Sequence, residues 1–414
     1  MRGAEGDVAS LTVKMELLAP AGGEDAFRAA IRWGADAVYF GLKNPFNARQ
    51  KADNFSIENL PETIKFAHSK NVKVYLAFNT LIRQSELTKA VDEALTAYRA
   101  GADALIVQDF GLAKELLKRD PDIVLHASTQ AGIHNAEGAL HARELGFKRA
   151  ILSREANLDE IRAIKEKTGI EVEVFAHGAL CVSFSGACYF SSVAAGNSGN
   201  RGKCLQFCRK RYAAICRGGY PHPPDKTPLP LRAERSEARQ PQPYTKLTDG
   251  YLLSPADLCL PYELSVLSDA GVDGIKIEGR MRRPEYVAET VRTYRRALDG
   301  INDPSALNRL KTVYNRGDYT TGYLYGPPDN LIYKDIQGHK GLYAGDIIRI
   351  LGKFLEVKNK FENGDAFKIL RNGLEIGSAL CENGRLVYSG KPRAGDKLHI
   401  TTSVKQNREL LDIL

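Results

Sequence analysis

The sequence has no long hydrophobic run. Its longest apolar stretches, such as Val72–Phe78 and Ala104–Val107, have the length of a β-strand, far short of the roughly 20 residues that cross a membrane as a helix. The first twenty residues also lack the basic and apolar segments of a secretory signal peptide. We therefore expect neither a membrane span nor secretion, and a cytoplasmic location. Residues 1–14 precede the first periodic pattern and are expected to form an N-terminal extension.

Signatures of common hydrolases are also missing. The chain contains no HExxH zinc-protease motif and no GxSxG nucleophile elbow. It has seven cysteines, six of them between Cys181 and Cys259. An odd number of cysteines without a secretion signal argues against a disulfide framework. Such clustering more often indicates metal binding or catalysis.

The first 300 residues alternate short β-branched stretches with amphipathic helical stretches, which is the pattern of βα units on a parallel sheet. The expected strands are Met15–Ala19, Asp36–Phe40, Val72–Phe78, Ala104–Val107, Ile123–His126, Arg149–Leu152, Glu171–Phe175 and Gly274–Ile277. Eight such strands close a (β/α)₈ barrel. A doubly wound open sheet would need an early glycine-rich phosphate loop, which LAPAGGEDA approximates only weakly.

The predicted fold class is therefore α/β, a (β/α)₈ TIM-type barrel with a small C-terminal antiparallel β domain. The barrel is expected over residues 15–300 of the 414, with a cysteine-rich insertion at 178–258. Within it, Tyr220–Pro243 has the Pro- and Arg-rich composition of a flexible insertion. A helical linker is expected at 301–330. Short strands separated by glycine turns predict a small β-barrel-like domain at 331–414.

Polar residues follow nearly every predicted barrel strand, at the end of the barrel where active sites of this architecture lie. We call this end the mouth. The candidates there are Asn47, Arg49, Asn79, Gln108, Asp109, Ser128, Thr129, Gln130, Ser153, Arg154, Glu155, His177, Lys276, Glu278 and Arg280. Any one of them would also serve as a loop cap or in a salt bridge. Together they predict a catalytic mouth.

The clustered cysteines follow the seventh strand and so belong at the mouth. They are Cys181, Cys188, Cys204, Cys208, Cys216 and Cys259. Four thiolates bind either Zn²⁺ or an iron–sulfur cluster, and the spacing leaves both open. CxxC knuckles are absent, and Cys259 is expected to open a helix whose N-terminus would favour its thiolate. These features favour a cluster over zinc.

Two further interpretations concern single cysteines. A nucleophilic cysteine near His177 is an alternative, but it would need only one activated thiol. Cys381, in the predicted β domain, is expected to be a buried apolar residue.

The formal net charge of +8 is concentrated in one segment. Residues 201–246 hold eleven Lys and Arg against three Asp and Glu, so the rest of the chain is neutral in sum. A basic segment beside a cysteine cluster predicts an anionic partner such as RNA. A solvated basic loop is the alternative.

These residues lie in segments that resemble peptidase family U32, the collagenase-like proteins. The resemblance covers about residues 15–300, through ELLAPAG, FNARQKADNF (46–55), EVFAHGALCVSFSGACYFSS (173–192), GNRGKCLQFCR (199–209), LLSPADLC (252–259) and GIKIEGRMRRPEYVAETVRTYR (274–295). It implies an oxygen-independent hydroxylase that carries a [4Fe–4S] cluster and modifies a nucleobase in tRNA or rRNA, with prephenate as a possible co-substrate. By resemblance the cluster ligands are Cys181, Cys188, Cys204 and Cys259, with Cys208 as the alternate fourth ligand.

The resemblance and the residues agree on the class of mechanism, because hydroxylation without O₂ needs redox chemistry that no side chain supplies. Arg49, Arg154 and Arg280 are predicted to bind a small dicarboxylate, since guanidinium groups suit carboxylates. Asn79 and Lys276 complete the predicted substrate site, and Glu278 or His177 is the predicted acid or base. A U32-type peptidase, a ubiquinone-ring hydroxylase and a non-catalytic cluster-bearing RNA-binding protein are the alternatives.

Overall fold

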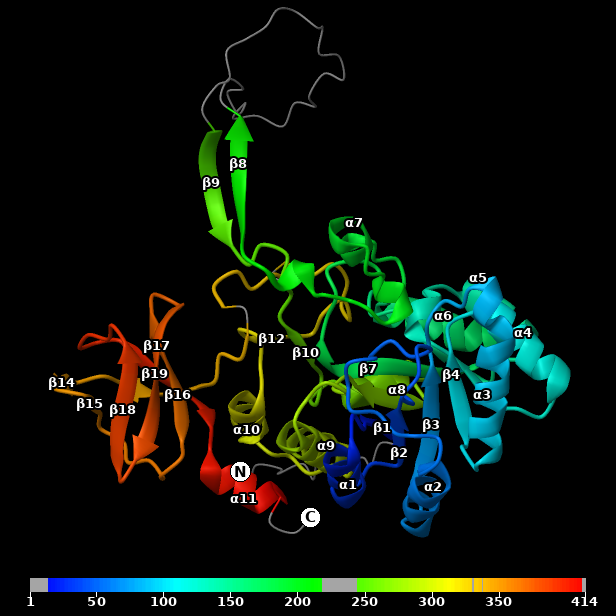
Figure 1. Ribbon diagram of the computed structural model, residues 1–414, viewed down its shortest axis with the longest axis horizontal. Helices are drawn as coiled ribbons and strands as arrows, with labels where there is room; N and C mark the ends of the chain where they lie inside the picture. The colour runs from blue at the N-terminus through cyan, green and yellow to red at the C-terminus, as the bar shows by residue number, and fades with distance from the viewer. Residues whose placement is uncertain (1–13, 218–243, 330, 337, 412–414) are drawn as a thin grey trace, which may run out of the picture.

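The computed structural model describes residues 14–217, 244–329, 331–336 and 338–411. A barrel and a smaller C-terminal sheet lie side by side, and a hairpin projects from the barrel (Figure 1). The predicted N-terminal extension, apart from Lys14, and the predicted flexible insertion Tyr220–Pro243 lie outside the described residues. Within the described ranges, no helix is long and apolar enough to cross a membrane.

Eight parallel strands form the barrel. They are β1 (Glu16–Pro20), β2 (Ala37–Phe40), β3 (Lys73–Phe78), β4 (Ala104–Val107), β5 (Leu125–Ala127), β6 (Arg149–Ile151), β7 (Glu171–Ala179) and β11 (Gly274–Ile277). Neighbours from β1 to β7 pair in sequence order, and β11 pairs with both β7 and β1, which closes the ring. The predicted (β/α)₈ barrel is confirmed.

Helices follow the strands and cover the outside of the barrel. They are α1 (Glu24–Arg32), α2 (Leu60–Ser69), α3 (Leu87–Arg99), α4 (Phe110–Arg119), α5 (Ala136–Glu144), α6 (Leu158–Thr168), α8 (Leu264–Asp269) and α9 (Pro284–Leu298), with 3₁₀ turns at Gln84–Glu86, Thr129–Ala131, Gly199–Arg201 and Phe207–Arg209. Local signals set their ends. Asn157 and Glu160 form a capping box at the start of α6, and Gly169 ends it with a φ of 64°. The Asp109 carboxylate caps α4, so this mouth candidate has a structural role.

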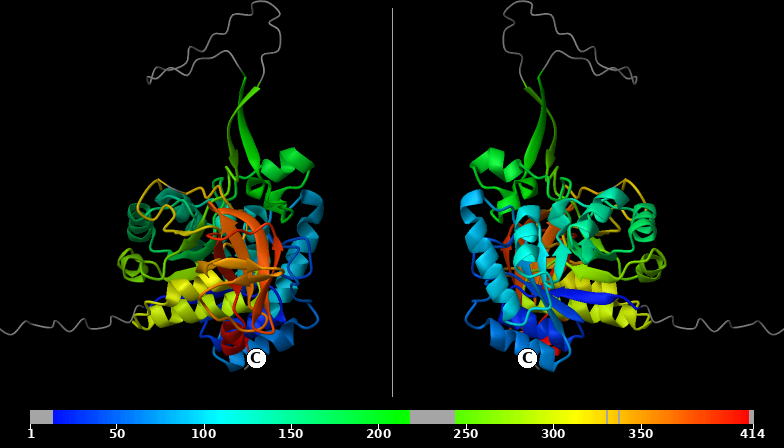
Figure 2. Two further views of the ribbon diagram at one scale, coloured as in Figure 1. Left: turned by 90° about the vertical axis from the view of Figure 1, so that its left-hand side faces the viewer. Right: turned by 90° about the vertical axis from the view of Figure 1, so that its right-hand side faces the viewer.

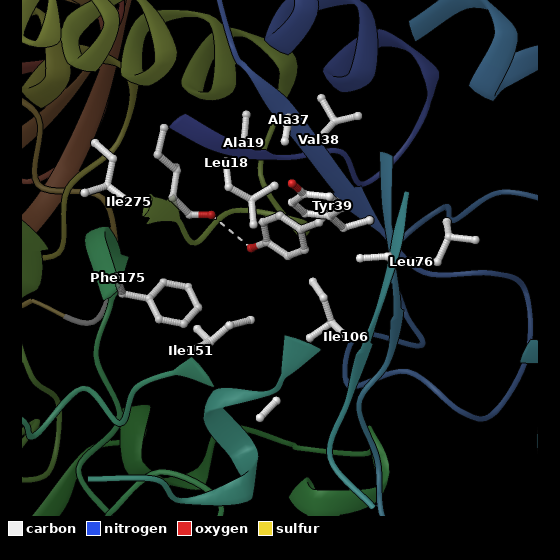
Figure 3. Close-up of a cluster of buried hydrophobic side chains, with 14 of the residues drawn as sticks. Leu18, Ala19, Ala37, Val38, Tyr39, Leu76, Ile106, Ile151, Phe175 and Ile275 are labelled. Carbon is white, nitrogen blue, oxygen red and sulfur yellow. Dashed lines mark hydrogen bonds between the residues drawn. The ribbon is translucent and has the colours of Figure 1, made fainter. Parts of the chain in front are cut away.

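Large side chains fill the middle of the barrel. Tyr39, Ile106, Ile151 and Phe175 come from four different strands and lie around a common interior space (Figure 3). The Tyr39 hydroxyl donates a hydrogen bond of 2.9 Å to the carbonyl oxygen of Ile277 and so connects β2 to β11. The interior is a packed core, as expected for a barrel of eight strands.

A buried ionic layer lies toward the N-terminal end of the barrel. Arg149 of β6 bonds the carboxylates of Glu16 at 2.5 Å and Glu173 at 3.0 Å. Glu173 is completely buried and also accepts from Lys276 at 3.0 Å. Buried charges are tolerated when they are paired and hydrogen-bonded, and in this layer each one is.

A strand anchors the cysteine-rich insertion to the barrel. β10 (Asp257–Cys259) pairs antiparallel with the end of β7, with Cys259 opposite His177. The following helix begins only at Leu264, so the prediction that Cys259 opens a helix is wrong. The insertion also contains α7 (Phe190–Ala195) and the hairpin of β8 (Tyr212–Arg217) and β9 (Tyr244–Gly250). This hairpin stands away from the barrel in every view (Figure 2).

The C-terminal part is an open antiparallel sheet in the order β13-β19-β16-β17-β18-β15-β14. The chain reaches this sheet through α10 (Ala306–Val313) and β12 (Tyr319–Thr320). The elements of the C-terminal part are β13 (Leu342–Asp346), β14 (Arg349–Leu351), β15 (Phe354–Glu356), β16 (Ala366–Arg371), β17 (Leu374–Glu382), β18 (Arg385–Gly390), β19 (Lys397–Thr402) and α11 (Val404–Leu411). Its separate core includes Cys381, which is buried as predicted. α11 returns to the barrel, where Leu410 packs on Ala29 and Ala288.

The ionic layer generates a stability prediction. Replacing Arg149 by Met leaves the buried carboxylates of Glu16 and Glu173 without their shared guanidinium, although Lys73 and Lys276 remain near them. We expect the free energy of unfolding to fall by about 3 kcal/mol in urea denaturation. Arg162→Ala, which removes an exposed arginine paired with Asp159, should cost less than about 1 kcal/mol. Equal midpoints for the two variants would contradict the role of Arg149.

Candidate active site at the mouth of the barrel

A small cavity of about 80 Å³ opens at the mouth of the barrel. Its wall combines an apolar floor with polar residues from the strand ends. It is lined by Tyr39, Ala48, Arg49, Asn79, Ile106, Ser128, Thr129, Gln130, Ile151, Arg154, Phe175, Cys181, Lys276, Glu278 and Arg280. Six residues of the predicted site, namely Arg49, Asn79, Arg154, Lys276, Glu278 and Arg280, therefore lie around one space.

Glu278 lies between two arginines. Its Oε1 is 3.1 Å from Nη2 of Arg49, and its Oε2 is 3.5 Å from Nη2 of Arg154. Burial would raise the pKa of the Glu278 carboxyl group, but the positive charges of Arg49, Arg154 and Arg280 outweigh it and lower the pKa to about 2. The group is thus ionised at neutral pH and is a weak base. Its geometry suits an anchor for arginines better than the predicted acid–base role.

Arg280 is buried at the mouth and has a weaker set of partners. Its Nη1 lies 3.4 Å from Oδ1 of Asn47, and its guanidinium carbon lies 5.7 Å from the centre of the Tyr39 ring. Burial lowers the pKa of Arg280 to about 10, so it remains a cation at neutral pH. No carboxylate of the described residues forms an ion pair with it, which leaves its charge available to an anionic ligand.

Lys276 and Asn79 have partners of their own. Lys276 bonds Glu173 and lies 4.1 Å from the centre of the Tyr39 ring, and burial lowers its pKa. The Asn79 side chain accepts from the backbone N–H of Ala48 at 2.9 Å, which fixes the loop that carries Arg49. Both residues border the cavity, and both also have structural roles.

His177 is not at the mouth cavity. Its ring packs against Tyr286, Tyr294 and Tyr319, with centroid distances of 5.6 to 5.7 Å. The reason is a bulge in β7: Lys276 pairs with Phe175, but the next residue, Ile277, pairs with His177. One extra residue in a strand makes the side chains after it point to the opposite face of the sheet. Burial lowers the pKa of His177 to about 4, so the ring is neutral and remote from the predicted catalytic position.

The cysteine-bearing insertion packs directly on the mouth loops. A Cβ atom at Gly186 would lie 2.1 Å from the Gln130 carbonyl oxygen, and one at Gly202 would lie 2.3 Å from that of Asn47. Both glycines have positive φ values, of 77° and 74°. Only glycine fits such conformations at such close contact. The insertion is therefore held over the loops that follow β2 and β5.

Four of the cysteines share one neighbourhood in this insertion. Burial raises the pKa of the Cys208 thiol, Arg209 lowers it, and the thiols of Cys181, Cys204 and Cys188 raise it again, so the four groups lie within electrostatic range. Cys181 lines the mouth cavity and lies within electrostatic range of Arg49. In their present positions, no three His, Cys, Asp or Glu side chains of the described residues converge as metal ligands do. A bound cluster would require the four thiols to draw closer.

Cys259 lies apart from this group. It is buried in β10, and the groups that affect it are Tyr294, Asp257 and Lys311 rather than other thiols. Burial raises the pKa of its thiol, the opposite of the predicted stabilisation by a helix N-terminus. The arrangement favours Cys208, the alternate predicted ligand, over Cys259. Cys216 lies in β8, in a part of the hairpin whose side chains are not described.

Three residues of the site were not singled out from the sequence. The Phe175 ring lies 4.0 Å from the guanidinium carbon of Arg154 and supports it. Tyr39 forms the opposite part of the floor. Arg209 is buried and donates to Ser254 Oγ at 2.8 Å and to the carbonyl oxygens of Pro255 and Leu180, which connects both ends of the insertion. The only sequence signal for Arg209 is its place beside Cys208 in GNRGKCLQFCR.

Comparison with known proteins gives related sequences over most of the chain. An uncharacterized protease of Methanocaldococcus jannaschii is 38% identical over 76% of this chain and 74% of that protein. The 23S rRNA 5-hydroxycytidine C2501 synthase of Escherichia coli is 35% identical over 86% of this chain, but the match spans only 52% of that enzyme. The tRNA hydroxylation protein P of Escherichia coli is 31% identical over 96% of this chain and 95% of that protein.

The family description Peptidase family U32 matches residues 22–333. This range contains the barrel apart from β1, the cysteine-rich insertion and every residue that lines the mouth cavity. The chain belongs to peptidase family U32.

Proposed function

We propose that this chain is an oxygen-independent iron–sulfur hydroxylase that modifies a nucleobase of tRNA or rRNA. The observation that carries the proposal is the position of Cys181, which lines the same cavity as Arg49, Arg154 and Arg280. A redox group bound at this cysteine would face a cationic pocket at the end of the barrel where catalysis occurs in this fold. The names of the two Escherichia coli relatives, an rRNA 5-hydroxycytidine synthase and a tRNA hydroxylation protein, support RNA as the substrate.

The proposed ligands of the [4Fe–4S] cluster are Cys181, Cys188, Cys204 and Cys208. Their thiols lie within electrostatic range of one another, and four thiolates are the usual ligands of such a cluster. When bound, the cluster would supply one-electron transfer, which no side chain of the mouth provides. Arg209, whose guanidinium is fixed to both ends of the insertion, would hold Cys208 in position.

The arginines are proposed to bind a small dicarboxylate co-substrate such as prephenate. The carboxylate of Glu278 already pairs with Arg49 and Arg154, and it keeps both side chains extended toward the cavity. Arg280 has no such partner in the part of the chain that the structure describes, and it is the guanidinium best placed to receive a ligand carboxylate. The reaction balances when a hydroxylated acid is the donor. The donor exchanges its C–OH bond for a C–H bond, and the base exchanges a C–H bond for a C–OH bond.

The apolar floor suits the flat ring of a base. Tyr39 and Phe175, each with a cation over one face of its ring, form the apolar part of the cavity wall together with Ile106 and Ile151. Aromatic side chains commonly stack on unpaired bases of RNA. An enzyme that modifies a base takes it out of its stack and into such a pocket.

The peptidase alternative has less support from the geometry. A thiol or hydroxyl nucleophile needs an adjacent base, and the residues that line the mouth cavity include no histidine within the described chain. His177 is buried among tyrosines, away from Cys181. The name of the Methanocaldococcus jannaschii relative remains the reason to test for proteolysis.

The cluster generates a direct prediction. Protein purified without oxygen should contain iron and sulfide and absorb broadly in the visible range. Cys181→Ala and Cys208→Ala should lose this absorbance, whereas Cys259→Ala and the distant Cys381→Ala should keep it. Loss in Cys259→Ala with retention in Cys208→Ala would instead support the ligand set implied by the family resemblance. A colourless, iron-free protein would contradict the cluster.

Activity gives a second prediction. Arg280→Ala should keep its iron but lower RNA hydroxylation about 100-fold, because a charge-assisted contact to the co-substrate is lost. Turnover is measured by mass spectrometry of nucleosides from the tRNA and rRNA of a deletion strain, treated with the holoenzyme. Arg119→Ala, an exposed arginine on α4, is the control and should retain full activity. Proteolysis of gelatin without RNA modification would contradict the proposed function.

A further inference from the structure

A second cavity lies where the barrel meets the C-terminal sheet, and we call it the junction cavity. It has a volume of about 400 Å³. One wall is the loop from β11 to α9 with the first turn of α9, and the other includes the end of α10 and the strands β16 and β19. The residues that matter here are Arg282, Arg283, Glu285, Tyr314, His339 and Lys368.

Three arginines, Arg280, Arg282 and Arg283, lie in the loop from β11 to α9. Among the described residues, no carboxylate forms an ion pair with Arg280, Arg282 or Arg283. The arginines further along α9 differ, since Arg292, Arg295 and Arg296 all have acidic partners. Arg283 is exposed, and its side chain does not cap the helix. Guanidinium groups left unpaired in this way are suited to bind phosphate.

One of these arginines is held rigidly against an aromatic stack. The guanidinium carbon of Arg282 lies 3.5 Å from the centre of the Tyr314 ring, and Tyr314 stacks on His339 at 5.2 Å and 17°. His339 Nε2 lies 3.2 Å from the carbonyl oxygen of Thr312 and 3.1 Å from that of Thr401. The stack therefore links α10, β19 and the loop, and it presents Arg282 in a fixed orientation.

A carboxylate in the same wall indicates more than phosphate binding. Oε2 of Glu285 is buried and has no hydrogen-bond partner among the described residues. A phosphate ion alone would be repelled by this group. A nucleotide, however, has both a phosphate for the arginines and N–H or O–H groups that a carboxylate can accept, such as the ribose 2′-hydroxyl.

The junction cavity is adjacent to the mouth. Arg280 lines the mouth cavity and Arg282 lines the junction cavity, and two residues along a chain are at most about 7 Å apart. A third cavity, of about 430 Å³, has both arginines in its wall together with Lys51, Asp25 and Asp53. The three spaces therefore follow one loop from the mouth to the C-terminal sheet.

We propose that the junction cavity binds a nucleotide of the RNA substrate next to the target base. Arg282 and Arg283 bind its phosphate, Glu285 accepts from its ribose or base, and the C-terminal sheet supplies the far wall with Lys368. This assignment rests on the proposed function in RNA modification. It gives the C-terminal sheet a role in selecting the RNA, separate from the chemistry at the mouth.

The test uses Arg283→Ala in the holoenzyme, because this exposed side chain has no ion-pair or capping partner among the described residues. With RNA from a deletion strain, we expect KM to rise about 10-fold with kcat unchanged. With a fluorescein-labelled single-stranded RNA, the slope of log Kd against log salt should fall by about 0.7 to 1, the effect of one lost phosphate contact. Glu285→Gln should raise KM without changing the salt slope. Arg119→Ala removes the same charge from α4 and should change neither quantity.

The outcomes separate this proposal from the proposed function. If the wild-type enzyme hydroxylates RNA but Arg283→Ala matches Arg119→Ala in KM and salt slope, the junction proposal is wrong and the enzyme assignment stands. Displacement of the labelled RNA by inorganic phosphate as effectively as by a nucleoside monophosphate would also overturn it. If wild-type holoenzyme modifies no RNA, the proposed function fails, and an Arg283-dependent salt slope would still support nucleotide binding. Ultraviolet cross-linking should place RNA on the peptides that contain Met281 and Tyr314.

Discussion

The ionised carboxylate of Glu278 allows the mouth to hold several arginines at once. It lies between Arg49, from the loop after β2, and Arg154, from the loop after β6. These guanidinium groups would repel one another across a buried space in which charge is poorly screened. Because β11 pairs with both β7 and β1, the carboxylate at its end reaches both sides of the mouth. The strand that closes the barrel therefore also carries the carboxylate that pairs with the arginines.

The alternation of residues along β11 extends this arrangement through the barrel. Lys276 and Glu278 face the interior, where Lys276 bonds Glu173 and Glu278 bonds the arginines. Successive side chains of a strand point to opposite faces, so the completely buried Ile275 and Ile277 contact the hydrophobic core. The aromatic layer of Tyr39 and Phe175 lies beside both charged groups. An ionic layer on each side of the apolar floor gives the mouth a fixed geometry before any ligand binds.

The sequence allowed the barrel and most of the mouth to be predicted, because both depend on local patterns. Buried parallel strands are short apolar runs, and their C-terminal ends meet at one end of a barrel. The errors at His177 and Cys259 have a common cause in pairing between distant segments. A bulge where β7 meets β11 turns His177 toward α9, and the pairing of β10 with β7 makes a strand of the predicted helix start. No local pattern encodes either contact, nor the grouping of Cys208 with the other thiols.

The same contacts explain why a long insertion is compatible with a closed barrel at this position. β7 continues past the barrel to Ala179, and β10 pairs with this extension, so the insertion leaves and returns at one place. Arg209 binds Leu180 and Ser254 near its two ends, and the cost of closing a loop rises only slowly with its length. Gly186 and Gly202 then fix the cysteine segment on the mouth loops. The position of the thiols therefore depends on a few fixed contacts with a rigid scaffold, which is how binding loops are commonly supported.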